Sequence, residues 1–185
     1  SDFIQLASFA GAFRKAEDKN QEQQKESDIW KNSPFEWILH LPAAKKGKLA
    51  RYLITSWCTS KGIKVKSAKG TKNLALEING ALAVVKMSTK WKGGKYTFQQ
   101  VRDSGYNYLV CLGISPFEAH CWIFDLHYAI ENATLQHKGE KGGEYWIGID
   151  PISPDDWTKG RGGTLEDAYQ VLRKIKPNKS TKSSK

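Results

Sequence analysis

An Asn79-Gly80 pair joins two short apolar segments, and it constrains the fold more than any other feature of the sequence. The two segments span residues 74–78 and 82–87. Asn-Gly suits the positive backbone φ angles of a two-residue turn whose twist matches that of paired strands. The pattern therefore predicts two antiparallel strands that meet at this turn.

Further apolar runs predict the rest of a buried sheet. Residues 108–114 and 119–124 form continuous apolar runs of strand length, which is typical of strands covered on both faces. Residues 63–66 and 145–149 are expected to be strands as well. The segment 97–102 is expected to be helical.

Two amphipathic helices are expected to cover this sheet. Residues at helical spacing between positions 49 and 57, Tyr52 among them, form one apolar stripe, and Gly62 ends that helix. Thr164 is a typical N-cap for a second helix with apolar positions from 165 to 175. This order of elements predicts an α/β fold with a mixed central sheet flanked by helices.

Composition divides the chain into a core and two ends. Residues 1–32 are expected to form an N-terminal helix that runs into a charged segment, and residues 33–176 the folded domain. Residues 177–185 are rich in Lys and Ser and should form a disordered basic tail. A length of 185 residues with 39% hydrophobic side chains suits one such domain.

The charge of the chain limits the classes of partner. Lys and Arg number 29 against 19 Asp and Glu, so the net charge is +10 and favours polyanions such as nucleic acid or an anionic membrane surface. No apolar run approaches the roughly 18 residues of a membrane span, and the first residues lack a signal-peptide pattern. We therefore expect a soluble, cytoplasmic protein that does not act at a membrane.

Side chains that often carry chemistry are given structural roles here. Cys58, Cys111 and Cys121 lie in apolar contexts without CxxC spacing, so we expect reduced, buried thiols. His120 lies in an apolar strand and is expected to be a core or strand-edge residue. The aspartates of a Pro-rich loop are expected to stabilise turns; they are Asp150, Asp155 and Asp156.

Four segments between Ser33 and Trp122 carry a resemblance to a known family. They are SPFEWILHLP, KKGKLARYLITSWCTSKG, VVKMSTKW and YTFQQVRDSGYNYLVCLGISPFEAHCW. This stretch, about half of the chain, resembles type II restriction-endonuclease-like proteins of the PD-(D/E)xK superfamily. The resemblance implies a nuclease-type core and a duplex DNA partner.

The catalytic positions of that superfamily are changed in this sequence. The family places an Asp on one hairpin strand and an acid two residues before a Lys on the next, and the carboxylates hold Mg²⁺. The resemblance assigns the lysine to Lys86, while the acidic positions hold Val84, Ala75 and, on the preceding helix, Arg51. It therefore implies no metal site and no cofactor, unless Glu77, on the same strand face as Ala75, serves as a relocated ligand.

Basic and amide side chains around this hairpin are the candidate DNA contacts. Lys and Arg neutralise phosphates, whereas Gln and Arg can also contact the edges of adenine and guanine. The alternative for the basic loops is a solvated surface without a ligand. The candidates are Lys45, Lys46, Lys48, Arg51, Lys90, Lys92, Lys95, Gln99, Gln100, Arg102, Lys159 and Arg161.

Duplex DNA binding with cleavage lost or severely reduced is the function that the sequence favours. An active Mg²⁺-dependent endonuclease that uses Glu77 and Lys86 is the first alternative. A protein-interaction module is the second, and a homodimer is compatible with each of these functions. Salt-sensitive DNA binding and Mg²⁺-dependent cleavage distinguish the three.

Overall fold

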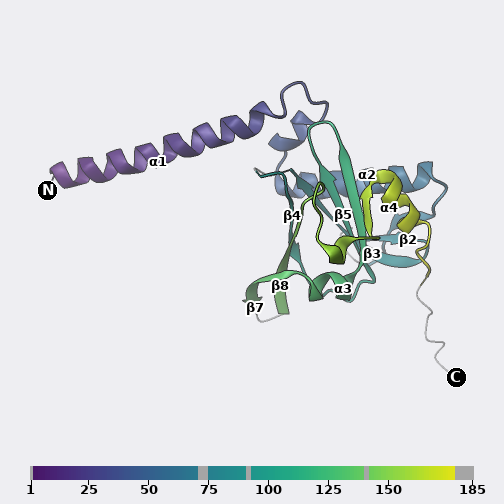
Figure 1. Ribbon diagram of the computed structural model, residues 1–185. Coiled ribbons are helices and arrows are strands. Elements are labelled where there is room, and N and C mark those ends of the chain that lie inside the picture. The colour runs from purple at the N-terminus through teal and green to yellow at the C-terminus, as the bar shows by residue number, and fades with distance from the viewer. Residues whose placement is uncertain (1, 71–74, 91–92, 140–141, 178–185) are drawn as a thin grey trace.

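Three layers make up the body of the molecule, from which a long N-terminal helix projects (Figure 1). The structure is a computed structural model that describes residues 2–70, 75–90, 93–139 and 142–177. A six-stranded sheet forms the middle layer, with helices α2 (Ala43–Ser60) and α4 (Leu165–Leu172) packed on one face and a three-stranded sheet on the other. The predicted α/β fold, a mixed central sheet flanked by helices, is confirmed.

The middle sheet contains the predicted hairpin. Its strands, in spatial order, are β1 (Val65–Ser67), β2 (Ala75–Ile78), β3 (Ala81–Thr89), β5 (Tyr108–Ile114), β6 (Ala119–Asp125) and β9 (Gly162–Thr164). β3 and β5 run parallel, and the other neighbouring pairs are antiparallel. Asn79 and Gly80 have φ values of 48° and 80°, so the turn between β2 and β3 is confirmed with the geometry that the sequence predicts.

The second sheet corrects one prediction. Its strands, in spatial order, are β4 (Tyr96–Val101), β8 (Gly142–Ile149) and β7 (Thr134–Gly139), and helix α3 (Leu126–Glu131) contributes to the same core. The expected helix over 97–102 is therefore wrong. Tyr96 and Phe98 are fully buried and alternate with half-buried residues, which is the period of a strand. An extra residue after Gln99 interrupts this alternation and obscures it in the sequence.

The N-terminal helix α1 (Asp2–Asp28) continues through the charged segment that was expected to follow it. Its side chains are exposed where they are described, including Phe9 and Phe13. The core begins only at Trp30, which is 1% exposed, and continues through the short helix η1 (Glu36–His40). None of the helices in the described part of the chain is long and apolar enough to cross a bilayer.

Helix α2 buries a slightly different stripe from the predicted one. It starts directly after Pro42, and its buried residues are Ala50, Ile54 and Cys58. Tyr52 is 67% exposed, so its assignment to the buried stripe was wrong. The buried residues recur at every fourth position from Ala50, and this spacing places them on the face that packs against the sheet.

Helix α4 has the predicted cap. The Thr164 hydroxyl accepts a hydrogen bond from the Asp167 N–H, and the Asp167 carboxylate accepts one from the Thr164 N–H. This reciprocal capping box satisfies two N–H groups at the start of the helix. The buried side of α4 contains Ala168 and Leu172, as the apolar pattern predicts.

The prediction of buried, reduced cysteines is confirmed. Cys58, Cys111 and Cys121 are free and buried. Burial raises the pKa of the Cys58 thiol to about 11, because the thiolate loses its hydration. The three thiols therefore act as small apolar side chains of the core.

Gly113 on β5 leaves space for the ring of Tyr96, and we predict that Gly113→Ala destabilises the protein. A Cβ atom at this position would lie 2.6 Å from Cε2 of Tyr96, which has no exposed surface through which to withdraw. We expect a loss of about 1–3 kcal/mol in the free energy of unfolding, which chemical denaturation measures. Gly11→Ala is the control, because its new Cβ has no atom within 4 Å and helix α1 favours Ala. Equal stability of Gly113→Ala and wild type would contradict this packing.

Candidate nucleic-acid interface

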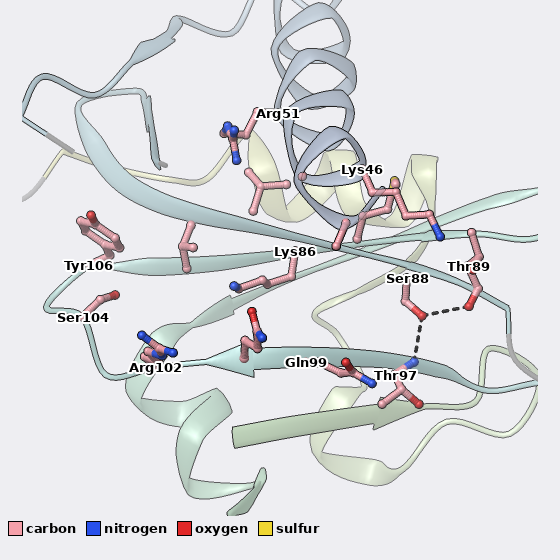
Figure 2. A pocket seen from close by; sticks show the side chains of 16 residues that line it. Lys46, Arg51, Lys86, Ser88, Thr89, Thr97, Gln99, Arg102, Ser104 and Tyr106 are labelled. Carbon is pink, nitrogen blue, oxygen red and sulfur yellow. Dashed lines mark hydrogen bonds between the residues drawn. The ribbon is translucent and has the colours of Figure 1, made fainter. Parts of the chain in front are cut away.

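A cavity of about 630 Å³ lies between the first turns of α2, strand β3 and strand β4 (Figure 2). Four of the residues that line it are cations, namely Lys46, Arg51, Lys86 and Arg102. No Asp or Glu is among the described residues that line it. The cavity therefore attracts anions and disfavours free metal cations.

Lys86 lies on β3 between the guanidinium groups of Arg51 and Arg102 (Figure 2). Burial lowers the pKa of the half-buried Lys86 ammonium below its ordinary value of 10.5. The nearby charge of Arg102 lowers this pKa further, and Arg51 acts in the same direction. An anionic ligand in the cavity would therefore stabilise the charged form of Lys86.

Helix α2 contributes one lysine and one arginine to the cavity. The helix already begins at Ala43, so these basic residues lie in its first turns. Lys46 and Arg51 line the cavity, whereas Lys45 and Lys48 are exposed on the helix outside it. The angular spacing of the helix thus divides the basic cluster between the cavity and the outer surface.

Ser88 joins the two sheets at the edge of the cavity. Its buried hydroxyl accepts a hydrogen bond of 3.0 Å from the Thr97 N–H of β4 and donates one of 2.9 Å to the Thr89 carbonyl (Figure 2). Ser88 was not among the residues predicted from the sequence. Its position two residues after Lys86, on the same strand face, was the available signal.

The positions that the resemblance assigns to metal-binding acids do meet in space. Ala75 and Val84 are direct partners across the hairpin and lie on the same strand face as Lys86. Neither supplies a carboxylate. The carboxylate of Glu77, on that face as well, lies 3.7 Å from the Lys66 ammonium and does not line the cavity.

The residues present do not fit a Mg²⁺ site. Within the described ranges, no group of three or more His, Cys, Asp and Glu side chains could hold a metal ion. Mg²⁺ requires at least one or two carboxylates in addition to water and phosphate. Arg51, at the position of the helix acid, adds repulsion between like charges.

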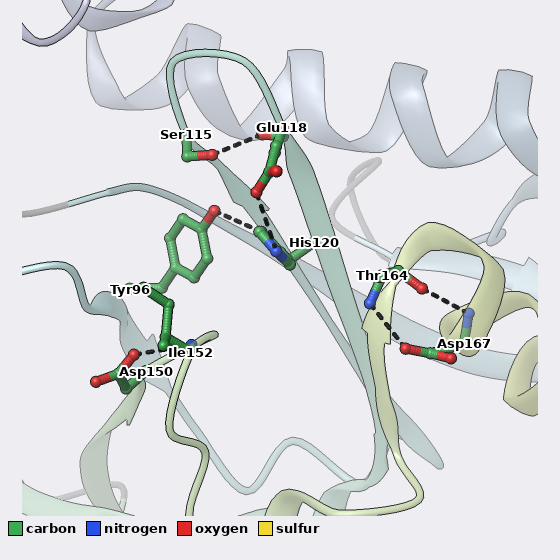
Figure 3. A network of polar contacts seen from close by, with 8 residues as sticks. All are labelled: Tyr96, Ser115, Glu118, His120, Asp150, Ile152, Thr164 and Asp167. Carbon is green, nitrogen blue, oxygen red and sulfur yellow. Dashed lines mark hydrogen bonds and ion pairs between the residues drawn. The ribbon is translucent and has the colours of Figure 1, made fainter.

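Two of the candidates in the loop after β3, Lys90 and Lys95, do not line the cavity. Lys92 is outside the described residues, while Lys90 follows directly after β3 and Lys95 is exposed just before β4. Both act electrostatically on Asp150, whose carboxylate accepts hydrogen bonds from the Ile152 N–H and the next backbone N–H (Figure 3). Those backbone bonds are the main reason that the pKa of Asp150 is lowered, and they confirm its predicted turn role.

The candidates between β8 and β9, Lys159 and Arg161, have partners within the chain. The Lys159 ammonium lies 2.6 Å from the Asp156 carboxylate. The Arg161 guanidinium lies over the Tyr128 ring, 4.1 Å from its centroid. Neither cation lines the cavity, so the structure does not group them with Lys86.

His120 belongs to a separate polar network (Figure 3). The Tyr96 hydroxyl lies 2.9 Å from His120 Nδ1, and the Glu118 carboxylate lies 3.7 Å from Nε2. Burial lowers the pKa of His120 and raises that of Tyr96 to about 12. The ring also stacks on Trp122 with a centroid distance of 5.9 Å, which agrees with the structural role expected for this histidine.

Comparisons with known proteins give no family assignment. No protein-family model and no curated protein matches the chain. Among solved structures, the bacterial homing endonuclease I-Ssp6803I is 19% identical, with 72% of this chain and 94% of that chain covered and a TM-score of 0.46. MepB is 12% identical, with 57% and 83% covered and a TM-score of 0.35. At these TM-scores neither structure assigns this chain to a family or an activity.

We predict that Lys86→Met raises the melting temperature at neutral pH. Because the pKa of Lys86 is lowered in the folded state, the unfolded chain binds more protons between that pKa and 10.5. The stability of the wild type therefore rises with pH across this window, and the gain from Lys86→Met shrinks as the pH approaches 10.5. Thermal denaturation over a pH series measures both effects.

Lys45→Met is the matched control for this experiment. Lys45 is exposed on α2 and does not line the cavity, so its substitution should change the melting temperature little at any pH. A Lys86→Met variant that is less stable than wild type at neutral pH would show that Lys86 contributes to folding.

Proposed function

We propose that the protein binds duplex DNA along the cavity between α2, β3 and β4 and does not hydrolyse it efficiently. The charge of the cavity carries this proposal, because four cations line it and no described lining residue is acidic. Basic side chains that neutralise phosphates release condensed counterions, and this release supplies much of the affinity for DNA. The net charge of +10 acts in the same direction.

The distribution of cations beyond the cavity favours an extended polyanion over a small anion. Lys45 and Lys48 are exposed beside the cavity on α2. Lys90 follows Thr89, the last cavity residue of β3, and Lys95 is exposed at the start of β4. A ligand that reaches all of these groups must extend beyond the cavity, as a phosphodiester backbone does.

The resemblance to PD-(D/E)xK nucleases supports duplex DNA as the ligand. It gives less support to hydrolysis of that DNA. The hairpin positions of the metal-binding acids are adjacent but hold Ala75 and Val84. Metal-assisted hydrolysis needs carboxylates that hold the cation against the developing charge on phosphate. Lys86 is then free to contact a phosphate group.

Salt dependence tests the proposed DNA binding. If the four cavity cations each contact one phosphate, the logarithm of the affinity should fall with the logarithm of the salt concentration with a slope of about −3 to −4. Lys46→Ala should weaken binding about equally on all sequences and reduce the slope by about one. Fluorescence anisotropy with a labelled duplex measures both quantities.

Lys61→Ala serves as the control with the same loss of charge, because Lys61 lies at the far end of α2 beside Tyr169. It should leave the slope close to that of the wild type. Absence of any salt-sensitive binding of the wild type to duplex DNA would overturn this proposal and favour a protein-interaction module.

A second experiment tests the proposed loss of catalysis. The wild type should show little Mg²⁺-dependent nicking of supercoiled DNA, whereas Ala75→Asp combined with Val84→Glu should improve divalent-metal binding, since the two positions face one another across the hairpin. Calorimetry with Mn²⁺ or Mg²⁺ measures the binding, and circular dichroism verifies the fold of the double variant. Robust cutting by the wild type that disappears in Glu77→Ala would identify an active endonuclease instead.

A further inference from the structure

Strand β4 contains a β-bulge at Gln99 and Gln100. Phe98 and Val101 are three residues apart on β4, yet they pair with residues of β8 that are only two apart. Gln100 has a φ of 56°, a value that few non-glycine residues adopt. One residue of β4 is therefore inserted into the pairing with β8.

The bulge changes which side chains face the cavity. In a regular strand, residues three apart point to opposite faces. Phe98 and Val101 are nevertheless both fully buried in the same core cluster. The inserted residue makes this arrangement compatible with the strand and leaves Gln99 and Gln100, two consecutive amides, lining the cationic cavity.

Packing alone explains the bulge but not the glutamine in it. Gly would adopt the φ of Gln100 at lower free energy, and the exposed Gln100 side chain lies outside the buried cluster. The residue that occupies this strained position adds a hydrogen-bonding amide to the cavity that Lys86 and Arg102 also line. Backbone strain of this kind is often retained at functional positions.

The chemistry of the amide selects a class of ligand. A glutamine amide both donates and accepts, and it matches the N6 donor and N7 acceptor of adenine in the major groove. Antiparallel strands are among the elements that present such side chains to the major groove, and β4 pairs with β8 in this way. The cations around it can contact the phosphates on either side.

We propose that Gln100 is a specificity-determining residue, held by the β4 bulge so that its amide hydrogen-bonds an adenine edge in the major groove of bound DNA. This inference rests on the proposed DNA binding and adds base selectivity to it. Gln99 is half-buried beside it, and the four cations of the cavity supply affinity without selectivity.

Selection of binding sites from a random duplex pool tests this inference. Wild type should enrich sites with a fixed adenine, and Gln100→Gly should lose the preference at that position and bind the best site about 10-fold more weakly. Because Gly suits a φ of 56°, Gln100→Gly should be at least as stable as wild type and should keep the wild-type salt slope. Gln100→Asn, which also tolerates a positive φ but has a shorter amide, should reduce the preference too.

Two controls separate base contacts from general effects. Replacement of the selected adenine by 7-deazaadenine removes the N7 acceptor and should weaken wild type but not Gln100→Gly. Gln170→Ala changes an exposed glutamine of α4 and should retain the full preference.

The outcomes also separate this inference from the function on which it rests. A wild type that binds DNA with salt sensitivity but without base preference would overturn the role of Gln100 and leave DNA binding intact. An unchanged preference in Gln100→Gly would overturn it as well. A wild type that binds no duplex at any salt concentration would overturn both proposals.

Discussion

The packing of strand β4 on the middle sheet is the contact on which the candidate interface depends. Tyr96 and Phe98 lie against Trp122 with ring centroids 5.9 and 6.4 Å apart, and Gly113 leaves the space that the Tyr96 ring fills. Aromatic side chains bury large apolar areas, so these contacts fix β4 firmly. Thr97 and Gln99 alternate with these buried residues and line the cavity, so the same packing forms one wall of it.

The aromatic packing of β4 lies beside a cavity in which four like charges repel one another. Lys86 is half-buried, and Arg102 and Arg51 both disfavour its protonated form. A site that lowers stability in the free protein and attracts an anion is typical of binding surfaces, since ligand charge relieves the repulsion. This relation between folding and binding is the physical basis of the proposed function.

The hairpin pairs two positions that the resemblance assigns to metal-binding acids, but neither position holds an acid. Ala75 and Val84 are direct partners, as two metal-binding acids would have to be, yet both are apolar. Glu77 lies nearby but is 3.7 Å from the Lys66 ammonium on the neighbouring strand. Backbone pairing can therefore bring two positions together without supplying the side chains that a metal site needs, so the fold alone does not establish a function.

Features that depend on local physics could be predicted from the sequence. The Asn79-Gly80 turn and the Thr164 cap depend on a few neighbouring residues, so both were predictable. The strand β4 was mistaken for a helix because its bulge breaks the period of two and its partner β8 lies far along the chain. Which basic residues share a cavity could not be predicted from the sequence: Lys46 lines it, whereas its neighbour Lys45, the same type of side chain, does not. That choice depends on how helix α2 is rotated against the sheet, which long-range packing sets.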